Sequence, residues 1–293
     1  SIRWWLPPGN HDNLSHAEPL WEEIARDSAP NIHAVTEARP VALQDDAVLL
    51  PAPVGFRSAG RDLTEDLPGM QTAEGQLRLG LAHGGVVDFT ESGANIPPDR
   101  DRSARLDYLA LGDWHGRREI GPRVHYSGSP EQTGFKHSRR GACLAVTLPG
   151  PGAAAQVAEV ETGAFLWLDL ELPLLAEQDP AEAFQALLPG GRRQDILLRI
   201  TATGRATLPG HADLRAAAER LGAEFAHFET RLDALATDYA AADLDEIDRA
   251  GALRLAAERL MAEAGDAALA AEDRDIAAAA LNRLYAYARE DGA

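Results

Sequence analysis

The chain reads LRLGLAHGG at residues 77–85 and YLALGDWHG at residues 108–116. Each stretch is a dense apolar run that ends directly in glycine, histidine or aspartate. Runs of this kind are typical of buried strands that deliver polar side chains at their carboxyl ends, where open α/β sheets bind their ligands. The sequence therefore predicts an α/β domain with a site at one edge of its sheet.

The flanking sequence extends this domain in both directions. Leu20 and Ile24, which follow Pro19, are at helical spacing and predict an early helix. Beyond the two central runs, glycine and proline separate short apolar segments that are typical of strands. These segments are residues 31–35, 47–50, 143–148, 156–161 and 165–172.

The character of the chain changes after Pro173. Helical and extended patterns alternate up to residue 243, which predicts a small α+β domain. From Leu244 onward, alanine, leucine and charged residues recur at helical period. One face of the last helix is predicted to carry Ile276, Ala280, Leu284, Tyr287 and Ala288. We therefore expect three parts: residues 1–172, 173–243 and 244–293.

Composition narrows the class of protein. The 293 residues are 45% hydrophobic and 25% charged, as in soluble globular proteins, and no apolar run approaches the roughly 20 residues of a membrane span. The single cysteine, Cys143, excludes an internal disulfide and a cysteine zinc cluster. We expect it to be buried on a strand, and we expect the protein to lie in a reducing cytoplasm.

Charge is unevenly distributed along the chain. The net charge of -18 argues against a surface generally coated for nucleic-acid binding. Residues 100–140 nevertheless contain nine basic and five acidic residues, whereas residues 233–293 contain six basic and fourteen acidic ones. The positive stretch therefore has two interpretations. It contacts phosphates locally, or it is an ordinary solvated face.

A third polar cluster precedes the two strand-end clusters. Residues 9–12 read Gly-Asn-His-Asp, which also suits an ordinary turn, because Asn and Asp bond to nearby backbone. Together, the three clusters supply amide and carboxylate oxygens and imidazole nitrogens. This mixture suits manganese, iron, zinc or magnesium. Two such ions can clamp a phosphate ester and supply a nucleophile for its hydrolysis.

These motifs resemble, in order and spacing, those of the calcineurin-like metallophosphoesterases, especially the DNA-repair exonuclease (SbcD-like) branch. The resemblance covers GNHD, the strand ending in His83, ALGDWHG and the segment YSGSPE at residues 126–131. It implies a four-layer α/β/β/α sandwich with a smaller α+β capping domain and a helical C-terminus. It also implies metal-dependent phosphodiester hydrolysis on DNA, and docking of the last helices on an SMC-like ATPase subunit.

The resemblance also assigns residues. It makes Asn10 and His83 ligands of one metal and His115 a ligand of the other. His11 would contact the scissile phosphate and assist the leaving oxygen, and Asp12 would orient that imidazole. Contacts to neighbouring phosphates are expected from Arg117, Arg118, Ser129, Lys136, Arg139 and Arg140.

The sequence departs from the family pattern in two places. Where the family has Gly-His-x-His, this chain has Gly112-Asp113-Trp114-His115. Asp113 can still bind a hard metal, and its charge favours Mn2+ or Mg2+ over Zn2+. The family's Asp-x-His and Gly-Asp-x-x-Asp motifs would lie before residue 9, so we expect the metallophosphoesterase domain to be incomplete at its start and this chain alone to bind metal poorly and hydrolyse little.

Two other functions remain open at this stage. A small-molecule phosphodiesterase or phosphatase would use the same metal motifs, and the acidic balance of the chain favours it slightly. A noncatalytic DNA-repair scaffold would account for the missing ligands and for Asp113. The preference for ends or interior sites of DNA, the native metal and homodimer formation are also left open by the sequence.

Overall fold

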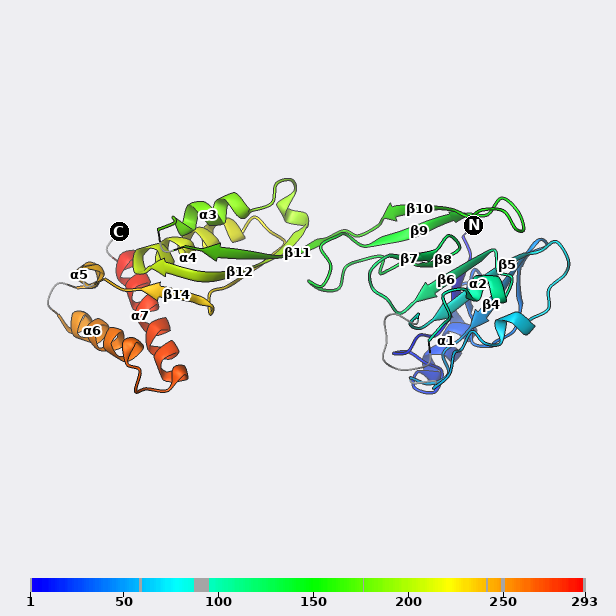
Figure 1. The fold of residues 1–293 in the computed structure, drawn as a ribbon, viewed down its shortest axis with the longest axis horizontal. Coiled ribbons are helices and arrows are strands. Elements are labelled where there is room, and N and C mark those ends of the chain that lie inside the picture. The colour runs from blue at the N-terminus through cyan, green and yellow to red at the C-terminus, as the bar shows by residue number, and fades with distance from the viewer. Residues whose placement is uncertain are drawn as a thin grey trace. The chain divides into compact units, whose positions relative to one another are not determined.

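The computed structural model describes residues 2–57, 60–86, 95–175, 177–240, 242–248 and 251–291. The chain folds into two compact units, and each combines helices with β-sheet (Figure 1). Unit 1 comprises residues 1–133 and 140–164, and unit 2 comprises residues 134–139 and 165–293. The mixed α/β class expected from the sequence is confirmed.

A six-stranded sheet forms the centre of unit 1. Its strand order is β3-β4-β5-β6-β8-β7. The inner pairs β4–β5, β5–β6 and β6–β8 are parallel, and the outer pairs β3–β4 and β7–β8 are antiparallel. The strands are β3 (Val41–Gln44), β4 (Ala47–Ala52), β5 (Leu77–His83), β6 (Tyr108–Gly112), β7 (Arg118–Gly121) and β8 (Val124–Tyr126).

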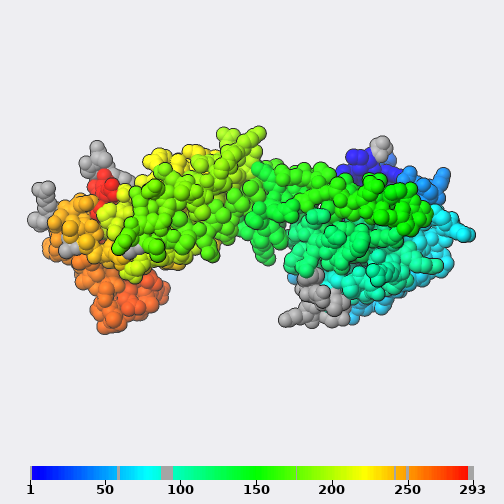
Figure 2. Space-filling model, turned by 45° about the horizontal axis from the view of Figure 1, so that its top comes forward, coloured from blue at the N-terminus to red at the C-terminus, as the bar shows by residue number. Residues whose placement is uncertain are grey.

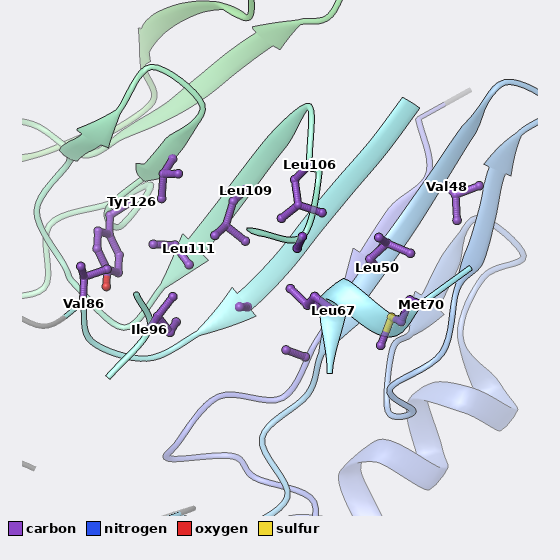
Figure 3. Packing of buried hydrophobic residues seen from close by; sticks show 14 residues of the cluster. Val48, Leu50, Leu67, Met70, Val86, Ile96, Leu106, Leu109, Leu111 and Tyr126 are labelled. Carbon is purple, nitrogen blue, oxygen red and sulfur yellow. The ribbon is translucent and has the colours of Figure 1, made fainter. Parts of the chain in front are cut away.

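One face of this sheet carries the core of unit 1 (Figure 3). Leu50 of β4, Leu109 of β6 and Tyr126 of β8 are fully buried there, together with Leu67 of the short 3-10 helix η1 (Leu67–Gly69). Gly80 lies between them on β5, where a Cβ atom would come within 2.7 Å of the Leu109 side chain. The glycine therefore allows close packing across β5.

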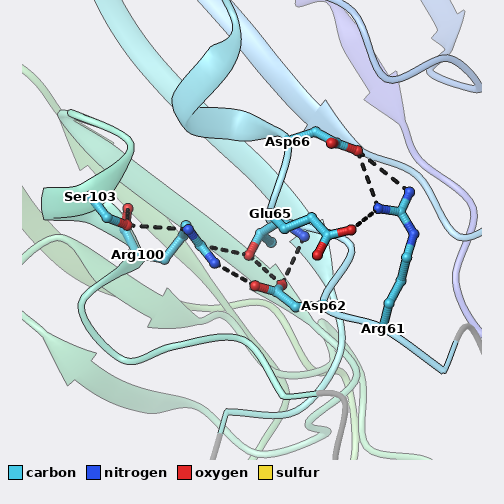
Figure 4. Close-up of polar contacts among 7 residues, drawn as sticks. Arg61, Asp62, Glu65, Asp66, Arg100 and Ser103 are labelled. Carbon is cyan, nitrogen blue, oxygen red and sulfur yellow. Dashed lines mark hydrogen bonds and ion pairs between the residues drawn. The ribbon is translucent and has the colours of Figure 1, made fainter.

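Two arginines secure the loops around this core. Arg100, at the start of α2 (Arg100–Ser103), forms an ion pair with Asp62 and donates a 2.9 Å hydrogen bond to the hydroxyl of buried Thr64 (Figure 4). Arg78 of β5 is buried and donates to the backbone carbonyls of four loop residues and to one hydroxyl. Both arginines thus satisfy backbone or side-chain oxygens that burial removes from water.

The first residues form a separate small sheet. β1 (Trp4–Leu6) pairs in parallel with β2 (Ile32–Ala34), and α1 (Glu18–Asp27) connects them. Pro19 occupies the first turn of α1, where its missing N–H costs nothing. The helix and β2 agree with the sequence patterns, whereas β1 was not predicted. The GNHD segment follows β1 directly.

A hairpin of β9 (Ala142–Thr147) and β10 (Gln156–Glu161) lies on the surface of unit 1, in green in Figure 2. It forms a two-stranded sheet of its own rather than extending a larger β-layer. Cys143 lies on β9, but its side chain is exposed, so the expectation that it is buried was wrong. The cause is that alternate residues of β9, Cys143 among them, face solvent.

Unit 2 is built on a parallel sheet. The central strand β12 pairs in parallel with β11, β13 and β14. Helices α3 and α4 bury Phe184 and Leu214 against Leu198 and Ile200 of β12. The elements are β11 (Leu166–Leu174), α3 (Pro180–Leu187), η2 (Arg193–Asp195), β12 (Ile196–Thr207), α4 (Leu208–Gly222), β13 (His227–Arg231) and β14 (Leu235–Asp238).

The boundaries of the two units differ from the division expected at residue 172. Pro173 lies inside β11, opposite Thr203 of β12, because a proline without an N–H is tolerated on a strand that pairs on one side. The change in composition at this proline therefore does not mark the start of the unit. Residues 134–139 also belong to unit 2, where Phe135 packs edge-on against Trp167.

The last helices belong to unit 2 as well. They are α5 (Asp243–Ile247), α6 (Ala252–Gly265) and α7 (Ala271–Asp291), and they share a core with Leu208 of α4. On α7 the buried side chains include Leu281 and Tyr285, whereas Ile276 and Tyr287 are exposed, so the expected apolar face was partly wrong. Among the described residues, no helix is long and apolar enough to cross a membrane.

Candidate functional site

The carboxyl ends of β5 and β6 and the segment after β1 meet at one pocket. β5 and β6 are parallel neighbours, and His83 is paired with Gly112 at their ends. The pocket has a volume of about 410 Å³. Its lining comprises Gly9, Asn10, His11, Asp12, His83, Gly112, Asp113, Trp114, His115, Gly128 and Ser129. All six residues predicted as catalytic or metal-binding therefore line the same pocket.

Three polar side chains converge on its floor. Nε2 of His83 lies 3.2 Å from Oδ1 of Asn10 and 3.5 Å from Oδ1 of Asp113. Nδ2 of Asn10 donates a 3.1 Å hydrogen bond to Oδ1 of Asp113. The His83 and Asp113 side chains are 22% and 29% exposed, so water screens their interaction only in part. These residues come from three separate parts of the chain.

Two glycines flank the imidazole of His83. A Cβ atom on Gly9 would lie 2.8 Å from Cε1 of His83, and one on Gly112 would lie 2.9 Å from Nδ1. Beyond His83, the hydroxyl of Tyr126 donates a 2.6 Å hydrogen bond to the carbonyl of Gly84. The ring of His83 therefore occupies a slot that only residues without a side chain can line, and a buried tyrosine holds the turn that follows it.

The GNHD segment is held in place by its own hydrogen bonds. Oδ1 of Asp12 accepts from the N–H of Gly9 at 2.6 Å, and the carbonyl of Asp12 accepts from the indole of Trp21 at 2.6 Å. Buried Asn13 donates to the carbonyl of Asn10 at 3.0 Å. Asp12 thus closes the turn that presents Asn10 and His11. Its expected role in orienting His11 stays a prediction.

Asp113 combines an unusual backbone with an unusual acidity. Its φ angle is +102°, in the left-handed region that non-glycine residues rarely adopt. The hydrogen bond with His83, assisted by that from Asn10, holds the pKa of the Asp113 carboxyl below its ordinary value, although partial burial opposes this. The carboxylate is therefore negative at neutral pH, and its strained position is typical of functional sites.

The mouth of the pocket differs from its floor. His11, Trp114 and His115 are the exposed residues of the lining, and we call them the mouth. Ser129 lines the same pocket, and its backbone N–H donates a 2.9 Å hydrogen bond to the carbonyl of His115. The lining thus combines a floor of three partly buried polar side chains with a mouth of three exposed residues, two histidines and a tryptophan.

The predicted phosphate-binding residues are not all brought to this pocket. Ser129 lines it, but Lys136 and Arg139 belong to unit 2. Arg117 pairs with Glu159 of the hairpin at 3.2 Å. Arg140 donates to the carbonyls of residues 163 and 164, which ties down the end of unit 1. Arg118 is exposed on β7. The basic stretch seen in the sequence therefore does not form one continuous surface of unit 1.

Sequence reasoning missed several residues that build the site. Trp114 was part of a quoted motif but received no role, although it lines the pocket. No supporting role was predicted for Asn13, Trp21 or Tyr126, although Tyr126 opens the YSGSPE motif. Each acts through a hydrogen bond to a backbone carbonyl, and only the folded chain brings the two groups together. The sequence signal for Asn13 was its position directly after GNHD, whereas its burial is seen only in the structure.

Two separations on the pocket floor can be compared with those around a metal ion. Atoms bound at about 2.0–2.2 Å to a single ion lie roughly 3.0–3.5 Å from each other. Nε2 of His83 lies within this range of Oδ1 of Asn10 and of Oδ1 of Asp113. Within the described residues, no three His, Cys, Asp or Glu side chains group to hold a metal by themselves. The third donor here is an amide, Asn10. The sequence matches no protein-family model and no curated protein significantly.

Proposed function

We propose that the pocket binds divalent metal ions and hydrolyses phosphodiesters, with DNA as the substrate. One observation carries the proposal: the side chains of Asn10, His83 and Asp113 contact one another in a pocket that His11 and His115 also line. The resemblance of the GNHD and GDWHG motifs to the DNA-repair exonuclease branch of the metallophosphoesterases adds support. The four-layer sandwich and capping domain of that family are part of the same proposal.

The proposed ligands of the floor are Asn10, His83 and Asp113. His83 would bind through Nε2, while its Nδ1 side stays between Gly9 and Gly112. The negative Asp113 favours a hard ion, so we propose Mn2+, with Mg2+, Fe2+ or Zn2+ as alternatives. His115 would hold a second ion. When bound, such ions polarise a phosphate ester and supply a nucleophile at neutral pH.

Proton transfer and phosphate contacts are proposed for side chains of the protein itself. His11, at the mouth, would donate a proton to the leaving oxygen, which requires its imidazolium form at the start of the step. Asp12 fixes the turn from which His11 projects. Ser129 would donate its hydroxyl to a phosphate oxygen, and Arg117 and Arg118 would contact neighbouring phosphates from the start of β7.

A second candidate substrate has a specific observation behind it. Arg117 is paired with Glu159, and Arg140 is engaged with backbone carbonyls, so both cations are already in use within unit 1. A small phosphodiester or phosphomonoester needs fewer phosphate contacts than DNA. The same residues would then act on a small ester, and the noncatalytic scaffold remains the alternative if the site binds metal without hydrolysis.

Metal binding and hydrolysis are best tested separately. Mn2+ binding would be followed by electron paramagnetic resonance in the unaltered chain, in His83→Ala and in the control His16→Ala, whose side chain is exposed outside the pocket. We expect His83→Ala to weaken binding at least tenfold and His16→Ala to leave it unchanged. Equal binding by all three proteins would remove the proposed metal site.

Hydrolysis would be measured with a DNA oligonucleotide and with bis(p-nitrophenyl) phosphate. His11→Ala should keep Mn2+ binding but reduce kcat about 100-fold or more on whichever substrate is cleaved. Turnover of the small diester without DNA cleavage would favour the second candidate. Mn2+ binding with neither activity would favour the scaffold.

The resemblance extends to partners and compartment. We propose a cytoplasmic protein whose C-terminal helices dock on an SMC-like ATPase subunit, with formation of a homodimer as the alternative. Exposed apolar side chains on these helices, Leu255 and Ile276 among them, are available for such contacts. Light scattering of the purified chain, with Leu255→Glu as the comparison, distinguishes self-association from a monomer that needs a different subunit.

A further inference from the structure

We infer that Trp114 is a base-stacking residue, and that the site accepts a single unpaired nucleotide whose phosphate lies over Asn10, His83 and Asp113. This inference rests on the proposed function and names its substrate class. Trp114 is the largest side chain that lines the pocket, and it is 43% exposed. Every other side chain of the lining is polar or absent.

The position of Trp114 follows from the backbone at the end of β6. Asp113 adopts the left-handed φ of +102° and directs its carboxylate to the floor, where it meets Asn10 and His83. The next residue, Trp114, is then at the mouth of the same pocket. One strained turn thus brings a carboxylate for the phosphate and an indole for the base into the lining of the same pocket.

The size and chemistry of the pocket limit the ligand. A volume of about 410 Å³ lies near the lower end of the roughly 300–1,000 Å³ of small-molecule sites. This is room for one nucleotide and not for a run of stacked bases. Indole surfaces stack on nucleobases of any sequence, because every base has a π-face. A base held in a duplex stacks on its neighbours instead, so the ligand must be unpaired.

The experiment measures binding rather than turnover. Isothermal titration with Mn2+ present would compare thymidine 5′-monophosphate and ribose 5-phosphate, which both carry a phosphate on a pentose, whereas only the nucleotide carries a base. Trp114→Ala should weaken thymidine 5′-monophosphate binding roughly 5- to 150-fold, from the usual strength of base–aromatic stacking. It should change ribose 5-phosphate binding less than about twofold, and Trp114→Phe should keep most of the affinity for the nucleotide.

Trp4→Ala is the matched control, because Trp4 is 54% exposed in the same unit and does not line the pocket. It should leave both affinities unchanged. Equal affinity of the unaltered chain and Trp114→Ala for the nucleotide would overturn the stacking role and leave the proposed function standing. An equal loss for both ligands would also overturn it, because Trp114 would then support the pocket rather than the base. Failure of the unaltered chain to bind either ligand would overturn the proposed function together with this inference.

Discussion

The amide of Asn10 donates a 3.1 Å hydrogen bond to the carboxylate of Asp113, 103 positions away in the sequence. The bond joins the segment after β1 to the end of the sheet strand β6. It couples a small two-stranded sheet to the central sheet of unit 1 at the point where the site is built. Any change that moves either strand end therefore changes the spacing of the donor atoms on the pocket floor.

The slot around His83 gives the first prediction. Gly112→Ala places a methyl group 2.9 Å from Nδ1 of His83, so the imidazole must move. We expect a loss of Mn2+ affinity of roughly 10- to 100-fold, as for residues that orient metal ligands. We also expect a cost in unfolding free energy of about 1–3 kcal/mol from overpacking. Gly121→Ala is the control, because its Cβ would meet nothing within 4 Å. Similar losses of Mn2+ affinity in both variants would contradict the conclusion that Gly112 makes room for the ring of His83.

Acid stability gives the second prediction. In the folded protein the pKa of the Asp113 carboxyl lies below its ordinary value of 3.8. The ionised carboxylate therefore stabilises the folded state fully at pH values above 3.8. This stabilisation is lost as the pH falls from 3.8 through the lowered pKa of the folded state. Urea unfolding from pH 5.5 to 2.5, with EDTA present, should show a shallower acid loss in Asp113→Asn than in the unaltered chain. Exposed Asp45→Asn should keep the full acid loss.

The buried guanidinium of Arg78 gives the third prediction. Arg78→Met keeps the volume of the side chain but leaves the backbone carbonyls of Leu67, Met70 and Ala104 without this donor. We expect the free energy of unfolding to fall by about 3 kcal/mol or more, as measured by urea denaturation. Arg61→Ala removes a half-exposed ion pair with Glu65 and should cost less than about 1 kcal/mol. Comparable losses of unfolding free energy in the two variants would contradict the expectation that the buried Arg78 contributes more than the half-exposed Arg61.

His125 on β8 gives the fourth prediction. It is 3% exposed, stacks on Tyr108 at a centroid distance of 5.6 Å, and has no hydrogen-bond partner at Nδ1. Burial lowers its pKa below 6.5, although Glu119 opposes this at 4.0 Å. The unfolded chain therefore takes up the proton first as the pH falls below 6.5, and stability should decrease there.

His125→Phe should reduce that loss of stability between pH 7 and 5 in urea titrations. At pH 7 its stability should be unchanged or about 1 kcal/mol higher, because an unpaired buried nitrogen has been removed. His16→Phe, at an exposed position, should keep the pH dependence of the unaltered chain. An unchanged slope in His125→Phe would show that another group titrates in this range.

The local sequence pattern was sufficient to predict most of the longer helices and strands. Apolar runs located β4, β5 and β6 within a residue or two, because buried strands need dense apolar side chains. The short strands β1, β3, β7 and β8 were missed, since three or four residues carry too little periodicity. Pro173 was interpreted as a domain boundary, but it lies inside β11. Its place there depends on pairing with β12, which no local pattern reveals.

The sequence by itself determined which residue types could form a site, because Asn, His and Asp stand where strands end beside glycines. Only the tertiary structure decided that Asn10, His83 and Asp113 share one floor and that Trp114 stands at its mouth. It also decided that Lys136 and Arg139 belong to the other unit. The physical reason is that parallel pairing brings distant strand ends to one sheet edge, whereas neighbours in sequence can fold into different cores.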